Sequence, residues 1–145
     1  MKTEQVARIL GGRKFLRVDV HSVTDLRELI HSGLPATSLI QMLKMFGLPQ
    51  EEAAKALGIP MRTMTRRLSG KARLSPIESE KAIRLARGFA RAEEVFDGDQ
   101  DKVVEWFRRP NRALGGEPPL HLMDSDLGAM QVDDVLGRIQ EGIVG

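Results

Sequence analysis

The chain has 145 residues and a net charge of +2, and its composition is 41% apolar but only 4% aromatic. This length fits one domain or two small ones, with enough apolar residues for a helical core. The absence of cysteine excludes disulfides, thiolate chemistry and thiolate zinc sites. Neither an 18-residue apolar run nor a signal peptide is visible, so we expect a soluble cytoplasmic protein.

Charge is distributed unevenly along the chain. Residues 1–96 carry 17 Lys and Arg against 10 Asp and Glu, a net +7, whereas residues 97–145 carry 5 against 10, a net −5. The basic excess is greatest in residues 61–91, which contain nine basic residues and two acidic ones. A basic middle followed by an acidic end indicates two tasks, one of them with a polyanion.

Residues 1–33 predict two helices separated by an ambiguous stretch. The first helix is short, and two glycines end it. A weak alternation of apolar and polar residues follows, typical of a strand or an extended connector, at Leu16, Val18 and Val20. Thr24 or Asp25 is the expected N-cap of the second helix, and Gly33 closes it. This segment is a candidate for the contact between two copies of the chain.

Residues 34–96 predict a helix-turn-helix domain. A first helix ends at Gly47, and a second one starts at Gln50 after a proline. Gly58 supplies a sharp corner, and Pro60 starts the third helix. On that helix an i, i+3, i+7 spacing predicts one buried apolar stripe, made of Met61, Met64 and Leu68.

Arginines and threonines occupy the opposite side of this helix. Such a face suits the major groove of DNA, where Arg forks onto guanine and Thr reaches a base edge, a thymine methyl group or a phosphate. The alternative interpretation is a helical hairpin with a solvated basic face. The candidate DNA-binding residues on this helix and in the loop after it are Arg62, Thr63, Thr65, Arg66, Arg67, Lys71 and Arg73.

A long helix follows, and its start is the clearest in the chain. Ser75 and Glu78 are spaced as a capping box, with proline at the first helical position. The helix is expected to run to about Phe96, with Ile77 among its inward-facing residues. Its basic side chains spread over the remaining surface, some of them close to DNA phosphates: Lys81, Arg84, Arg87 and Arg91.

Residues 97–145 predict a second, smaller helical domain. One helix carries Val103, Trp106 and Phe107 on a single face and ends at Pro110. The loop 111–116 and a short helical turn come next. The last helix has a clean i, i+3, i+4, i+7 spacing and closes at Gly142; its apolar residues are Val132, Val135, Leu136 and Ile139.

Motifs for catalysis and for cofactor or metal binding do not occur. The three histidines are far apart and form no HExxH pattern, and no Walker loop is found. The acidic pairs fit helix N-termini or solvation better than general acid–base chemistry. We therefore expect a protein that is not an enzyme and needs no cofactor or metal.

From about residue 30 onward the sequence resembles the Xre/MbcA/ParS antitoxins, the partners of RES-domain toxins. The resemblance is carried by GIPMRTMTRRL, by LSPIESEKAIRLAR and most specifically by the C-terminal block. That block contains W-F-x-x-P-N-x-A-L-G-G-x-x-P-L, a later lone Gly128, and V-x-x-x-L-x-R-I-x-x-G in this order. The resemblance implies an all-α fold with a Cro-like DNA-binding domain and a C-terminal toxin-binding domain.

The resemblance also implies partners. These are a NAD-consuming RES-domain toxin that the antitoxin neutralises by direct binding, double-stranded operator DNA through which it represses its own operon, and a second copy of the chain. Exposed residues of the C-terminal block are the candidates for toxin contact: Arg112, Gly115, Gly116, Arg138, Glu141, Ile143, Val144 and Gly145. For the last three, an apolar tail that enters the toxin's cleft and simple fraying of the chain end stay open as alternatives.

Two other functions compete with that of an antitoxin. One is a stand-alone transcriptional regulator whose acidic C-terminal domain dimerises or senses a ligand. The other is a protein-interaction module that never meets DNA.

Overall fold

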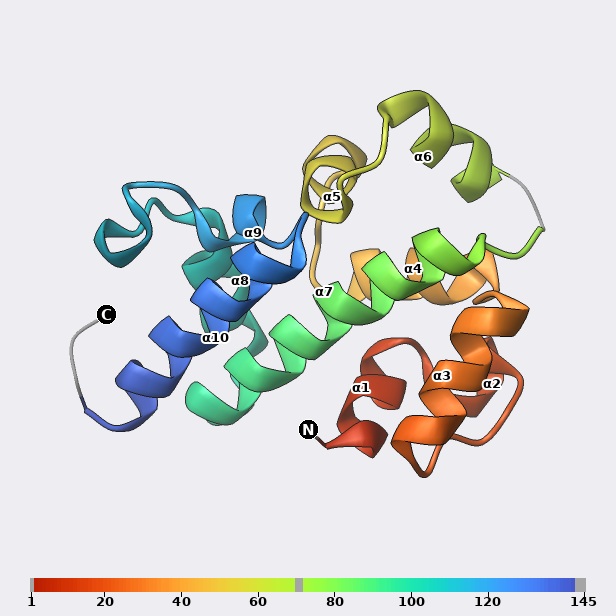
Figure 1. Ribbon diagram of the computed structural model, residues 1–145, viewed down its shortest axis with the longest axis horizontal. Coiled ribbons are helices and arrows are strands. Elements are labelled where there is room, and N and C mark those ends of the chain that lie inside the picture. The colour runs from red at the N-terminus through yellow and green to blue at the C-terminus, as the bar shows by residue number, and fades with distance from the viewer. Residues whose placement is uncertain (1, 70–71, 143–145) are drawn as a thin grey trace.

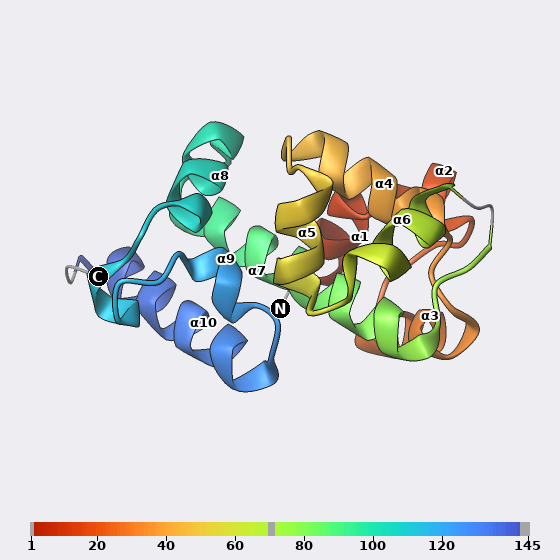
Figure 2. The ribbon, with the colours of Figure 1, turned by 90° about the horizontal axis from the view of Figure 1, so that it is seen from above.

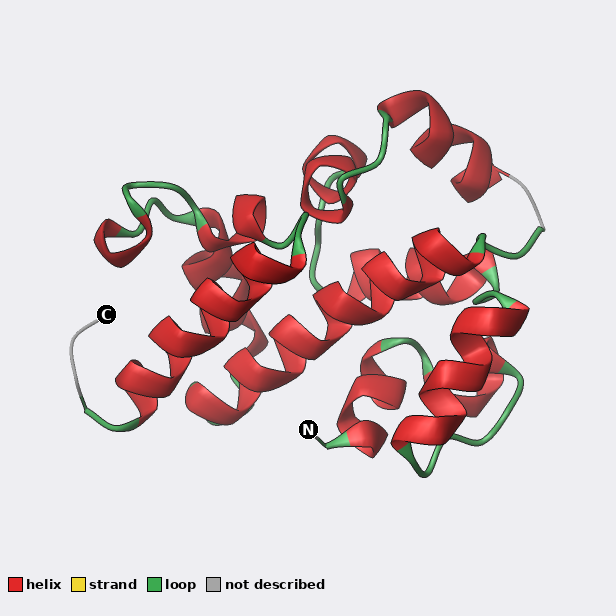
Figure 3. Cartoon of the chain, viewed as in Figure 1, coloured by secondary structure: helices red, strands yellow, loops and turns green. Residues whose placement is uncertain are grey.

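A computed structural model describes residues 2–69 and 72–142 of the chain. These ranges contain helices joined by short loops and no β-strand, as Figure 3 shows, which confirms the all-α prediction. The elements in Figure 1 are α1 Thr3–Ile9, α2 Gly12–Leu16, α3 Val23–Ser32, α4 Ala36–Met45, α5 Gln50–Leu57, α6 Met61–Ser69, α7 Pro76–Val95, α8 Gln100–Arg108, the 3-10 turn η1 Arg112–Leu114, α9 Pro119–Leu122 and α10 Asp126–Gln140.

Helix α7 is the central support of the molecule. It contacts α1, α3 and α5 on one side and α8 and α10 on the other. Seen from above in Figure 2, the N-terminal helices and the C-terminal helices lie to either side of it. The predicted capping box begins the helix: Ser75 Oγ accepts from the Glu78 N–H, and the Glu78 carboxylate accepts from the Ser75 N–H.

Aromatic rings join the two halves through α7. Phe89 is fully buried; its ring centroid lies 4.2 Å from that of Phe46, the C-cap of α4, and 5.0 Å from that of Phe107 in α8. Trp106 extends this stack with an edge contact to Phe107. The buried apolar residues on both sides of residue 96 form one continuous cluster. The sequence-predicted segments 1–33, 34–96 and 97–145 therefore share a core.

Of the two alternatives for Leu16, Val18 and Val20, the strand was wrong, whereas residues 17–22 form a connector without regular structure. Leu16 itself ends a second short helix, because Gly11 and Gly12 adopt positive φ angles of 99° and 64° and reverse the chain into α2. Helix α3 is capped by Ser22, not by Thr24 or Asp25. The Asp25 carboxylate instead accepts a hydrogen bond from the His21 backbone N–H, which lowers the pKa of that carboxyl.

Ile77, which was expected to face inward, is 69% exposed. Side chains two positions apart in a helix point about 200° away from each other, so Ile77 and Ser79 lie on opposite sides of α7. Ser79 is fully buried, and its hydroxyl accepts a hydrogen bond from the Leu34 N–H at 2.8 Å. The polar contact thus decides the orientation of the first turn of α7, and the apolar side chain is left in solvent.

Candidate functional site

Helices α5 and α6 meet at the predicted corner. Gly58 has the left-handed φ of 66° that the corner requires, and the Ile59 N–H donates back to the carbonyl of Ala54. The corner is also held from outside: Lys81 Nζ donates to the Gly58 carbonyl at 3.0 Å, and a Cβ on Gly58 would lie 3.2 Å from that of Asp124. The corner is therefore fixed both by α7 and by the segment that precedes α10.

Helix α6 is attached by one side and open on the other. Met64 is its only fully buried residue, Leu68 is half-buried, and the helix packs on α4 and α5. Met61 was predicted to be buried but is 38% exposed, because the first turn of α6 extends beyond the helices beneath it. The apolar stripe is thus shorter than predicted.

The outer side of α6 carries Arg62, Thr65 and Arg66, all exposed. The Arg62 and Arg66 side chains are one turn apart and make no hydrogen bond or ion pair within the part of the chain that the structure describes. Thr63 lies at the flank and is half-buried, and Lys71 lies outside the described residues. Two unpaired guanidinium groups beside a threonine form a face suited to hydrogen bonds with bases or phosphates.

Two of the predicted DNA-binding arginines are engaged within the protein. Arg67 Nε donates to the Glu78 carboxylate at 2.8 Å and so ties α6 to the start of α7. Burial favours a higher pKa for Glu78, but the hydrogen bond from the Ser75 N–H and the Arg67 guanidinium outweigh it and hold the pKa below its usual value. Arg73 donates to the Gly33 carbonyl at 2.7 Å and closes the loop after α6 onto the scaffold.

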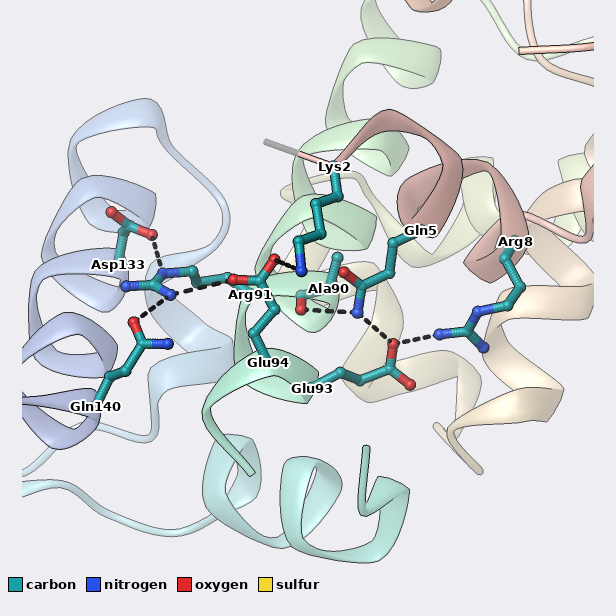
Figure 4. Close-up of polar contacts among 9 residues, drawn as sticks. All are labelled: Lys2, Gln5, Arg8, Ala90, Arg91, Glu93, Glu94, Asp133 and Gln140. Atoms are coloured by element: carbon teal, nitrogen blue, oxygen red, sulfur yellow. Dashed lines mark hydrogen bonds and ion pairs between the residues drawn. The ribbon is translucent and has the colours of Figure 1, made fainter. Parts of the chain in front are cut away.

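The basic side chains of α7 face protein more than solvent. Arg84 pairs with Asp126 at 2.9 Å, and Arg91 pairs with Asp133 at 3.3 Å while it also donates to Gln140 at 2.8 Å. Both arginines therefore fasten α10 to α7, as Figure 4 shows for Arg91. Arg84 and Arg91, which were expected among the basic residues near DNA phosphates, thus have acidic partners within the chain, and Arg87 is exposed.

A buried carboxylate anchors α1 to the other side of α7. Glu93 is 4% exposed and accepts hydrogen bonds from Gln5 at 3.2 Å and from the Arg8 guanidinium. Lys2 lies 3.8 Å from the neighbouring Glu94, so the polar contacts of Figure 4 run from α1 across α7 to α10. No local sequence pattern predicts this cluster, since Arg8 and Gln5 are 85 and 88 residues away from Glu93.

The loop 111–116 is a compact turn. The Asn111 side chain accepts from the Ala113 N–H at 2.9 Å, and its backbone carbonyl accepts from the Gly116 N–H at 2.9 Å. Gly115 has a left-handed φ of 67°. Leu114 is buried beneath the turn, which contacts α10 and leaves Arg112, Gly115 and Gly116 exposed.

Helix α10 completes this region. Val132, Val135 and Leu136 are buried as predicted, and Arg138 and Glu141 are exposed near its end. Gly128 packs so closely that a Cβ would lie 1.9 Å from the Leu122 carbonyl oxygen, which explains why a glycine is needed there. The predicted contact residues Ile143, Val144 and Gly145 lie outside the described residues.

Comparison with known proteins identifies both regions. Residues 25–87 match the antitoxin Xre-like helix-turn-helix domain, and residues 91–142 match the antitoxin Xre/MbcA/ParS C-terminal toxin-binding domain. A relative from Photorhabdus laumondii called Antitoxin Xre is 36% identical over 121 residues, which cover 82% of this chain and 80% of the relative. An Antitoxin Xre from Yersinia enterocolitica is 34% identical over 127 residues, covering 77% of this chain and 86% of the relative. The chain belongs to the Xre antitoxin family.

The antitoxin is therefore a toxin-binding protein and not an enzyme, and this membership favours it over a stand-alone regulator. A more distant relative from Sphingobium, 27% identical over 129 residues that cover 83% of this chain and 81% of the relative, is called Prs ADP-ribosylating antitoxin. The two domain matches meet inside α7, between residues 87 and 91, whereas the sequence-predicted boundary was at residue 96. Within the described ranges, no helix has the length and hydropathy needed to cross a membrane.

Proposed function

We propose that this antitoxin binds and neutralises a RES-domain toxin that consumes NAD, and that it represses its own operon by binding double-stranded operator DNA. The family match supports a toxin as the partner, and the resemblance of the C-terminal block supports the RES class. The name of the Sphingobium relative fits this class, because ADP-ribosyl transfer uses NAD as the donor. Both tasks would be carried out in the cytoplasm.

One observation carries the DNA half of the proposal: Arg62 and Arg66 are exposed and unpaired on the outer side of α6, whereas Arg67 and Arg73 are held by protein partners. We assign base contacts to Arg62, Thr65 and Arg66, and a positioning role to Arg67 and Arg73. The net charge of +7 on residues 1–96 adds phosphate attraction. Binding should therefore weaken steeply as salt rises.

A gel-shift comparison tests this assignment. Arg62→Ala/Arg66→Ala should bind the upstream DNA of its own operon at least about thirtyfold more weakly than wild type, since each base-reading Arg contributes about 1–3 kcal/mol and every 1.4 kcal/mol is tenfold. Arg27→Ala/Lys44→Ala removes the same charge from exposed positions on α3 and α4 and is the matched control. If both double variants bind DNA as wild type does, α6 does not read the operator.

For toxin neutralisation we propose steric closure of the toxin's active-site cleft by the C-terminal block, without chemistry on the toxin. Arg112 and the two glycines of the η1 turn, together with Arg138 and Glu141, are exposed and available for this contact. Deletion of residues 142–145 tests whether the tail contributes. Unchanged inhibition would transfer the blocking role to the η1 turn or to α10.

A homodimer is also proposed, because helix-turn-helix proteins commonly place two recognition helices in successive major grooves. Larger assemblies with toxin would follow from such a dimer. Light scattering of the purified antitoxin, alone and with the toxin, measures both, and removal of residues 1–33 asks whether that segment makes the contact.

A further inference from the structure

Among the described residues of the C-terminal block, the two most exposed large apolar side chains lie next to each other on α10. Leu127 is 75% exposed and Met130 is 61% exposed, three residues further along the same helix. Scattered exposed apolar residues are ordinary on a protein surface, whereas neighbouring ones form a patch that calls for an explanation.

The pair belongs to a continuous outer face of α10. At about 100° per residue, the following side chains fall within a sector roughly 100° wide: Leu127, Met130, Gln131, Asp134, Arg138 and Glu141. All of them are exposed, while Val132, Val135 and Leu136 on the inner side are buried where α10 packs on α7, α9 and the η1 turn. We call these residues the α10 outer face: Leu127, Met130, Gln131, Asp134, Arg138 and Glu141. Its N-terminal part is apolar, and its C-terminal part carries charged groups.

A groove borders the α10 outer face at Met130, and α10 also contacts the η1 turn. Met130 lines a groove of about 850 Å³ between α7 and α10, with Gly88 and Arg87 among its other lining residues. Arg87 is exposed and makes no ion pair within the described ranges. On its other side α10 contacts the η1 turn, which carries Arg112 and the two exposed glycines.

We infer that the α10 outer face is the docking surface for the toxin, with Leu127 and Met130 as its apolar anchors. The whole face lies within residues 91–142, the segment that matches a toxin-binding domain, and α10 itself contacts the η1 turn. An apolar patch bordered by charged groups is an arrangement that protein interfaces use, because the apolar groups are desolvated on binding and the charged groups fix orientation. The inference rests on the proposed function, namely that this block binds a toxin.

Replacement of both anchors tests the inference. Leu127→Gln/Met130→Gln keeps side-chain length and helix preference but removes the apolar surface. The matched control is Val23→Gln/Ile77→Gln, which changes two comparably exposed apolar residues outside the toxin-binding segment, at 52% and 69% exposure. Each full-length protein is co-expressed with the tagged product of the adjacent gene, and the dissociation constant of the purified pair is measured.

The anchor variant should bind the toxin at least about tenfold more weakly and should protect cells less well, since interface anchors typically contribute more than 1 kcal/mol each. The control pair should bind toxin as wild type does, and both variants should keep their affinity for operator DNA. Equal toxin affinity of the anchor variant and wild type would overturn the inference and leave the proposed function intact.

Two other outcomes are informative. If wild type itself captures no product of the adjacent gene, the proposed function fails and the inference fails with it. If the anchor variant changes the oligomeric state by light scattering but keeps its toxin affinity, the α10 outer face belongs to a second copy of the chain and the inference is overturned.

Discussion

Helices α6 and α10 are both surface helices with one packed and one open side, yet they differ in how firmly they are attached and in what they expose. α6 has one fully buried residue, Met64, and exposes arginines and threonines. α10 has four buried residues, is joined to α7 by Arg84 and Arg91, and exposes Leu127 and Met130 among charged groups. The difference fits two kinds of partner. Charge attracts a polyanion over a distance, whereas an apolar surface acts only in direct contact and needs a rigid support.

Helix α7 connects the two surfaces. Its first turn holds α6 through Glu78, its middle holds both halves through Phe89, and its second half holds α10 through Arg91. The proposed DNA-binding and toxin-binding surfaces therefore depend on one scaffold. Substitutions in α7 should affect both binding activities, whereas substitutions confined to α10 should affect toxin binding alone.

The largest effect is expected at the shared core. Phe89→Ala removes a fully buried ring that packs between Phe46 and Phe107 and should lower the free energy of unfolding by about 3–5 kcal/mol. DNA binding and toxin binding should fail together at physiological temperature. Urea unfolding followed by circular dichroism measures the loss. Phe15→Ala, at a partly exposed position in α2, is the control and should lose far less. Separate unfolding transitions for the two halves would contradict a shared core.

A smaller and more local effect is expected at Gly128. A Cβ there would overlap the Leu122 carbonyl oxygen, so Gly128→Ala must push α10 away from α9 and should cost about 1–3 kcal/mol. Gly137→Ala in the same helix meets only the end of the Arg91 side chain at 3.6 Å and should be neutral or stabilise by up to about 1 kcal/mol. Thermal unfolding compares the two, and toxin affinity should fall only for Gly128→Ala. Equal stability of the two variants would mean that the α9–α10 contact yields without cost.

Local signals in the sequence were sufficient for most helix starts and ends. The capping box at Ser75, the corner at Gly58 and the spacing of Val132, Val135 and Leu136 depend on residues a few positions apart, so a single sequence displays them. Helix α2 was missed because five residues are too few to show a helical spacing of apolar side chains. Its start depends on the positive φ angles of two glycines.

Side-chain partners could not be predicted in the same way. Glu93 looks like an ordinary surface carboxylate, and Arg84, Arg91 and Arg67 look like free cations, until the fold brings their partners to them. Two members of the candidate DNA-binding set, Arg67 and Arg73, thus have partners within the protein that the sequence does not reveal. Exposure at Leu127 and Met130 was likewise invisible, because an apolar residue at a helical spacing is more often buried.

The smallest effect concerns pH and the contact between α6 and α7. The pKa of Glu78 lies below its usual 4.5 in the folded protein, because the hydrogen bonds from Ser75 and Arg67 outweigh the effect of burial. A carboxyl whose pKa is lowered by folding stabilises the protein above its unfolded pKa and loses that contribution as the pH falls through its folded value. At pH 7, Glu78→Gln should therefore be less stable than wild type by about 1 kcal/mol, and the difference should shrink below pH 4.5. Glu80→Gln, at an exposed position on the same helix, should change stability by less than about 0.5 kcal/mol at either pH. If the difference in stability between Glu78→Gln and wild type does not change with pH, the carboxylate charge does not hold α6 to α7.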